Sequence, residues 1–141
     1  MIRTLCSVLL VGTVAATILA AGTDPDYDPE LAEHGRDLYR IYCRNCHGEQ
    51  GKGDGPTAEA LEVKPSDLTR LSQRNKGEFP FDETYATIDG RDDLSAHRRR
   101  EMPIWGIAFQ EWDTDVDQTE QVRERILRLI EYLKSIQREK K

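Results

Sequence analysis

The chain of 141 residues carries a formal net charge of −6. An acidic chain of this length fits one small domain and argues against binding to nucleic acid or to an anionic membrane surface. It contains three cysteines, two of them in one short motif, so it offers no disulfide framework. The apolar residues are concentrated near the N-terminus, which leaves the rest of the chain poor in core-forming side chains.

Residues 1–22 have the layout of a secretory signal peptide. Arg3 precedes an uncharged run rich in Leu, Val and Ala, and Ala20-Ala21-Gly22 suits a cleavage site. We expect cleavage, which removes Cys6 and leaves residues 23–141 as one domain. The net charge then changes from −6 to −7, because one positive charge and no acid is lost. The alternative is an uncleaved anchor, since the apolar run approaches the length of a short membrane span.

The first predicted helix begins at Asp28, with Asp28 as the N-cap, Pro29 in the first helical position and an acid in the first turn. Apolar and aromatic side chains then recur at helical spacing, at Leu31, Leu38, Tyr39 and Tyr42. Gly35 lies on this helix at a place where a second helix could approach closely. His34 is expected on the exposed side of the helix.

This helix leads into Cys43-Arg44-Asn45-Cys46-His47, and Cys-x-x-Cys-His is the attachment signature of c-type haem. Residues three apart share a helix face, so both cysteines can reach one macrocycle and add to its two vinyl groups as thioethers. His47 follows directly, where its imidazole can reach the iron. A structural zinc site needs four ligands, and a redox dithiol is expected in a βαβ context; the sequence shows neither. Both of these alternatives predict a colourless protein.

The segment between the motif and residue 90 reads as loop and short helices. Gly48–Gly55 is a glycine-rich loop, and it lacks the pattern of a phosphate loop. Short helices are predicted at Thr57–Val63, Ser66–Ser72 and Asp82–Ile88, the last one capped by Asp82. No stretch alternates convincingly as a strand.

Met102 is the only methionine besides the initiator, so it is the only candidate for a thioether ligand. Pro103 directly after it favours an extended Met102 on a loop. A His/Met pair fills both axial positions of the iron and raises its potential, which favours electron transfer over ligand chemistry. The alternatives are a Met that only fills the core, or a His97 ligand that gives a bis-histidine haem of lower potential.

Two features near Met102 leave alternatives open. The stretch 91–101 contains Arg91 and Arg98–Arg100, and one arginine could pair with a haem propionate; a solvated basic loop is the alternative. Trp105 could pack on the haem edge with its indole N–H on a propionate, or simply pack in the core. Trp112 and Phe109 indicate burial only.

The last predicted helix is the clearest. Charged side chains separate the members of one apolar stripe, which are Val122, Ile126, Leu129, Ile130, Leu133 and Ile136. Asp117 or Thr119 could cap this helix.

Four segments in this order resemble those of a bacterial class I cytochrome c with one haem: Cys43-Arg-Asn-Cys46-His47-Gly48, Lys64-Pro65, Met102-Pro103 and Leu129-Ile130-Glu-Tyr132-Leu133-Lys134. The resemblance covers residues 31–135. It implies an all-α cytochrome c fold wrapped around one covalent haem c, with His47 as proximal and Met102 as distal iron ligand. It also implies that the Pro65 carbonyl accepts the other imidazole N–H of His47.

The resemblance implies that the first and last helices cross, which would bring Gly35 and Tyr39 against Leu129 and Tyr132. It implies a periplasmic single-electron carrier rather than an enzyme. Its partners would be donor and acceptor proteins, and an acidic chain fits a partner with a basic docking patch. One alternative is a cytochrome subunit of a dehydrogenase or terminal oxidase complex. The other is a haem enzyme or gas sensor in which Met102 does not bind the iron.

Overall fold

The computed structural model of the chain describes residues 26–91, 102–110 and 118–138. Across these ranges the secondary structure is helical and contains no strand, as the sequence predicted. The elements in chain order are α1 (Pro29–Tyr42), α2 (Arg44–His47), η1 (Ala58–Ala60), η2 (Leu68–Arg70), α3 (Leu71–Arg74), α4 (Phe81–Asp89), α5 (Trp105–Ala108) and α6 (Gln118–Ser135). The predicted signal peptide at residues 1–22 lies outside the described residues. In the part of the chain that the structure describes, no helix is long and apolar enough to cross a membrane.

The start of α1 is the one predicted. The carboxylate of Asp28 accepts hydrogen bonds from the backbone N–H groups of Glu30 at 2.9 Å and Leu31 at 3.1 Å. These bonds satisfy donors that the first turn of a helix leaves without partners. The backbone N–H of Asp28 also donates to the side chain of Glu131 at 2.7 Å, so the beginning of α1 is tied to α6.

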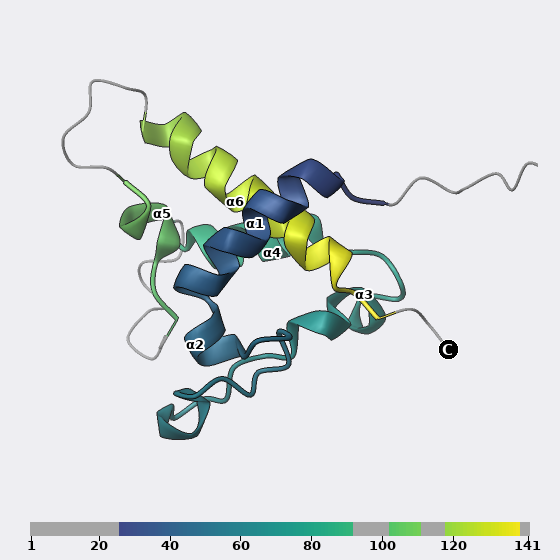
Figure 1. Ribbon diagram of the computed structural model, residues 1–141, viewed down its shortest axis with the longest axis vertical. Helices are drawn as coiled ribbons and strands as arrows, with labels where there is room; N and C mark the ends of the chain where they lie inside the picture. Colours follow the sequence, from purple (N-terminus) through teal and green to yellow (C-terminus); the bar gives the residue numbers. More distant parts are fainter. Residues whose placement is uncertain (1–25, 92–101, 111–117, 139–141) are drawn as a thin grey trace, which may run out of the picture.

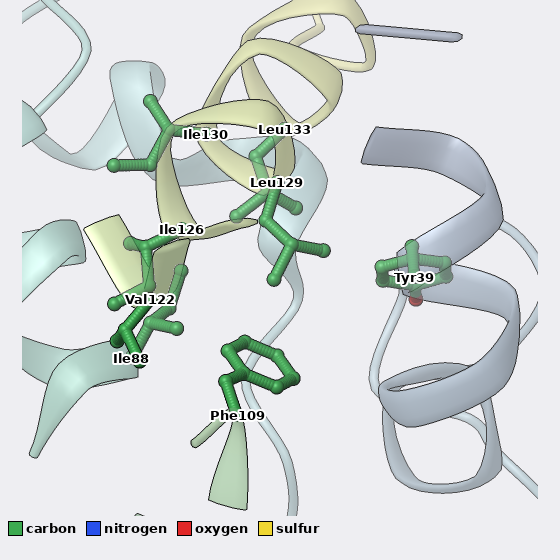
Figure 2. Packing of buried hydrophobic residues seen from close by; sticks show 8 residues of the cluster. All are labelled: Tyr39, Ile88, Phe109, Val122, Ile126, Leu129, Ile130 and Leu133. Atoms are coloured by element: carbon green, nitrogen blue, oxygen red, sulfur yellow. The ribbon is translucent and has the colours of Figure 1, made fainter. Parts of the chain in front are cut away.

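The apolar stripe of α6 forms most of the core. Five of its six predicted members are buried, namely Val122, Ile126, Leu129, Ile130 and Leu133. Ile136 is partly buried just after the helix ends. Figure 2 shows Val122 and Ile126 of α6 beside Ile88 of α4, and Leu129 on the side that faces Tyr39 of α1, with Phe109 in the same cluster. Thr119 lies inside the helix and is not its cap, whereas Asp117 lies outside the described residues.

Helices α1 and α6 cross, as Figure 1 shows, and the crossing point is at Gly35. A Cβ built on Gly35 would collide with the carbonyl oxygen of Arg128 and lie 3.0 Å from the Cβ of Tyr132. One turn further along α1, the ring of Tyr39 packs on Tyr132 with 5.0 Å between the ring centroids. The predicted crossing is therefore confirmed, and the missing side chain of Gly35 is what allows the close approach.

The two helices predicted at 57–63 and 66–72 are shorter in the structure, and parts of them are 3-10 turns. The segment 57–63 contains only the 3-10 turn η1, and the segment 66–72 contains η2 followed by the one-turn helix α3. The carboxylate of Asp67 caps η2 by accepting from the backbone N–H of Thr69 at 3.0 Å. Figure 1 shows α3 beside the C-terminal end of α6.

The end of α6 holds this region in place through hydrogen bonds. The side chain of Gln137 donates to the Leu68 carbonyl at 2.8 Å and accepts from the Ser72 backbone N–H at 2.9 Å. The backbone N–H of Arg138 donates to the Thr69 carbonyl at 2.9 Å. The segment of η2 and α3 is thus tied to the residues that directly follow α6, the helix that crosses α1.

The prediction that Asp82 caps α4 is wrong. The helix begins at Phe81 with Pro80 in the N-cap position, and Asp82 lies inside the first turn. Pro80 has a φ of −79°, near the helical value, so the chain can enter the helix directly after it. Asp82 still suits its place, because an acid in the first turn interacts favourably with the helix dipole. The short helix α5 was not predicted.

Candidate functional site

The Cys-x-x-Cys-His motif forms a single turn at the end of α1. Cys43 is the C-cap of α1, and its carbonyl accepts from the backbone N–H groups of Cys46 at 3.2 Å and His47 at 2.9 Å. These bonds keep the two cysteines one turn apart on one face. Both cysteines are half-buried and carry free thiols.

The two thiols have different surroundings. Cys43 packs against the hydrophobic core, and burial, with the neighbouring Cys46 as a smaller cause, raises the pKa of its thiol to about 12. Redox-active cysteines have a lowered pKa instead, so this environment is unlike that of a catalytic dithiol. The sulfur of Cys46 lies 3.3 Å from the hydroxyl oxygen of Thr57, which in turn donates to the Asn45 carbonyl at 2.8 Å.

His47 is half-buried, and its Nδ1 lies 3.1 Å from the carbonyl oxygen of Ser66. Nδ1 donates in this contact when it carries the ring proton, and Nε2 then keeps the lone pair that a metal ligand needs. Burial lowers the pKa of the imidazole, and the hydrogen bond to Ser66 opposes that shift only in part. The neutral ring is therefore favoured, which is the form that binds iron.

The acceptor for His47 differs from the one that the resemblance implies, because it is the carbonyl of Ser66 rather than that of Pro65. The Pro65 carbonyl oxygen lies against Gly53, where any Cβ would collide with it. Gly53 has a φ of 79°, and its N–H donates to the His47 carbonyl at 2.8 Å. The Pro65 carbonyl therefore lies against the glycine-rich loop, and the next residue turns its own carbonyl toward the imidazole.

Met102 lies three residues before the start of α5 and is partly buried. It packs against the same hydrophobic core as Cys43. Ile104 has an extended conformation as the N-cap residue of α5, and Phe109, which follows α5, is fully buried. Met102 is thus joined to an anchored element by a short link through Pro103.

Aromatic side chains connect α1 with α5 beside the motif. The ring of Tyr42 meets Trp105 edge-on at 5.5 Å and Phe109 at 5.2 Å between centroids. Trp105 stacks on Phe109 at 5.3 Å with 26° between the ring planes. Trp105 therefore packs with Phe109 of the core and with the more exposed Tyr42, and the sequence did not indicate Tyr42 as its partner. The proposed contact of the indole with a propionate stays a prediction.

The remaining candidate residues are placed as follows. His34 is exposed on α1, as expected. His97, Arg98–Arg100 and Trp112 lie outside the described residues. Arg91 makes a bidentate ion pair with Asp89, which the sequence did not predict. Among residues 26–91, 102–110 and 118–138, no group of three or more His, Cys, Asp or Glu side chains is arranged to hold a metal ion.

The site residues therefore come together in two groups. Cys43, Cys46 and His47 share one turn, and Met102 borders the same core as Cys43, whereas the carbonyl that meets the imidazole belongs to Ser66 and not to Pro65. No protein-family model, curated protein or solved structure matches the chain.

Proposed function

We propose that the protein is a periplasmic c-type cytochrome that carries single electrons between protein partners. The observation that carries this proposal is the turn at Cys43–His47, in which two free thiols lie one turn apart and the imidazole Nδ1 of His47 lies 3.1 Å from the Ser66 carbonyl oxygen. This set of groups is the one that covalent haem attachment requires. A one-electron iron couple is the chemistry that haem c supplies when bound.

The surroundings of the turn fit a large apolar group. Ten apolar side chains pack against the buried core but are only partly buried themselves: Leu38, Cys43, Leu68, Leu71, Phe79, Tyr85, Met102, Trp105, Tyr132 and Ile136. Partly buried apolar side chains around a small core are expected where a macrocycle completes that core. Cys43 and Met102 both belong to this set, which supports Met102 as the second ligand.

In the proposed protein each residue has a distinct task. Cys43 and Cys46 anchor the haem, His47 binds the iron with Nε2, and the Ser66 carbonyl orients the imidazole and increases its basicity. Met102 would be the second iron ligand, which would leave no open position for a substrate or a gas. The fold would be that of a small class I cytochrome c, with α1 and α6 as its crossing helices.

The proposed localisation and partners rest on the sequence. A secretory signal at residues 1–22 would take the chain to the compartment where haem is attached, and cleavage would release it from the membrane. The acidic surface of the chain would favour donor and acceptor proteins with a basic docking patch.

The test is an optical spectrum of the protein coexpressed with haem-attachment machinery, oxidised and reduced, with and without carbon monoxide. We expect low-spin c-type bands, a weak far-red sulfur-to-iron band in the oxidised state, and indifference to carbon monoxide. Met102→Ala should keep the covalent haem, bind carbon monoxide and have a lower potential. A wild-type protein that binds carbon monoxide would instead favour a haem enzyme or gas sensor.

A further inference from the structure

The ion pair between Asp89 and Arg91 lies at the end of α4, and three hydrogen bonds join Arg91 to the Asp89 carboxylate. The guanidinium donates from Nε to Oδ1 of Asp89 at 2.6 Å and from Nη2 to Oδ2 at 2.8 Å. The backbone N–H of Arg91 also donates to Oδ1 at 3.3 Å. Gly90 between them has a φ of 69°, which lets the chain fold back so that residues two apart face each other.

This pair is well shielded from solvent. The Asp89 side chain is only 14% exposed and that of Arg91 31% exposed, whereas the two side chains of the Arg36–Glu33 pair on α1 are 51% and 70% exposed. The hydrogen bond from Arg91 lowers the pKa of the Asp89 carboxyl. An acid at the C-terminal end of a helix is unfavourable with respect to the helix dipole, so Asp89 depends on Arg91 for its stability there.

The pair lies against the backbone of α5. A Cβ built on Gly106 would collide with Oδ1 of Asp89 and would lie 2.6 Å from Nε and 2.8 Å from Cγ of Arg91. Gly106 is buried, and its lack of a side chain is what allows α5 to approach the pair. The pair therefore sets the distance between α4 and α5.

On the basis of the proposed function, we propose that the Asp89–Arg91 pair is a positioning device for the Met102 thioether. It acts by holding α5 against α4. Ile88 anchors α4 in the core, so the helix end that carries the pair is held in place. Met102 is joined to α5 by Pro103, whose φ is fixed, and by Ile104, so a shift of α5 moves the sulfur. The two residues act through α5 and do not touch the reacting atoms.

The test uses the haem-loaded protein and two variants of the pair. Asp89→Asn keeps the shape and removes the charge, whereas Arg91→Lys keeps the charge and removes the planar fork. We expect both to weaken the far-red sulfur-to-iron band and lower the reduction potential, Asp89→Asn more strongly. Hydrogen exchange at the backbone N–H of Phe109, which bonds to the Trp105 carbonyl, should become about tenfold faster in Asp89→Asn.

Two further variants test the positioning role from the α5 side and supply a control. Gly106→Ala should have the same effects, because the new methyl group displaces the pair from the α5 side. Glu33→Gln is the matched control, since it removes one carboxylate from the exposed pair with Arg36 and should change none of these quantities.

The outcomes separate this proposal from the proposed function. If the wild-type protein shows no c-type haem spectrum, both are overturned. If the wild type has the expected spectrum but Asp89→Asn and Arg91→Lys keep the wild-type band, potential and exchange rates, only the positioning role is overturned. Variants with a lower melting temperature but an unchanged band and potential would also overturn it, because the pair would then merely support the fold.

Discussion

Replacing Gly35 by alanine tests the crossing of α1 and α6. Two effects oppose each other. Alanine is better than glycine in the middle of a helix by about 1 kcal/mol. Against this, the new methyl group would collide with the carbonyl oxygen of Arg128, which is backbone and has no alternative rotamer. Overpacking of this kind costs about 1–3 kcal/mol, and a rigid neighbour places the cost near the upper end. We therefore expect a net destabilisation of about 1–2 kcal/mol, since the collision outweighs the gain in helix propensity.

The assay is thermal unfolding of the haem-loaded variant followed by circular dichroism. A loss of this size in a domain of this length lowers Tm by about 3–10 °C. The matched control is His34→Ala, because His34 is the exposed neighbour of Gly35 on the same helix. The control gains helix propensity without a collision and should be as stable as the wild type or slightly more stable. A Gly35→Ala protein as stable as this control would refute the reasoning.

Three other outcomes are expected. The double substitution of Cys43 and Cys46 by alanine should yield a colourless, largely unfolded chain by circular dichroism, because the haem proposed to complete the core could then not be attached; a folded, coloured variant would contradict this. Tyr39→Phe removes the 2.6 Å hydrogen bond to the Gly48 carbonyl and should lower the free energy of unfolding by about 1–2 kcal/mol in urea titrations, and an unchanged midpoint would speak against a structural role for the bond. The pKa of Asp89 is lowered in the folded protein from its ordinary value of 3.8, so this group stabilises the fold above that pH and the stabilisation is lost as the pH falls through the folded pKa. Asp89→Asn should accordingly make acid unfolding less steep below about pH 4, and an identical acid profile would count against the ion pair.

The parts of the fold that the sequence predicts are those set by local chemistry and by periodicity. Asp28 followed by Pro29 specifies a helix start whatever lies around it, and the structure confirms that cap. The apolar stripe of α6 has a period of one helical turn, so its buried face could be identified without knowledge of its partner. Gly35 could be placed at the crossing because a glycine inside a helix needs a packing reason.

The parts that were missed depend on the path of the chain between elements. The acceptor for His47 is Ser66, whereas the Pro65 carbonyl lies against Gly53, and no local pattern fixes which of two adjacent carbonyls turns toward a distant ring. The pair of Asp89 and Arg91 was not predicted either. Residues two apart do not face each other on a helix, and only the left-handed turn between them brings them together.

The most direct test of the account is a denaturing mass spectrum of the purified protein, coexpressed with haem-attachment machinery. Thioether bonds survive unfolding, so the account predicts one species whose mass is that of residues 23–141 plus one haem. The haem mass should be lost when Cys43 and Cys46 are both replaced. A wild-type chain without the mass of a haem, produced under conditions in which another c-type cytochrome is loaded, would contradict the central claim.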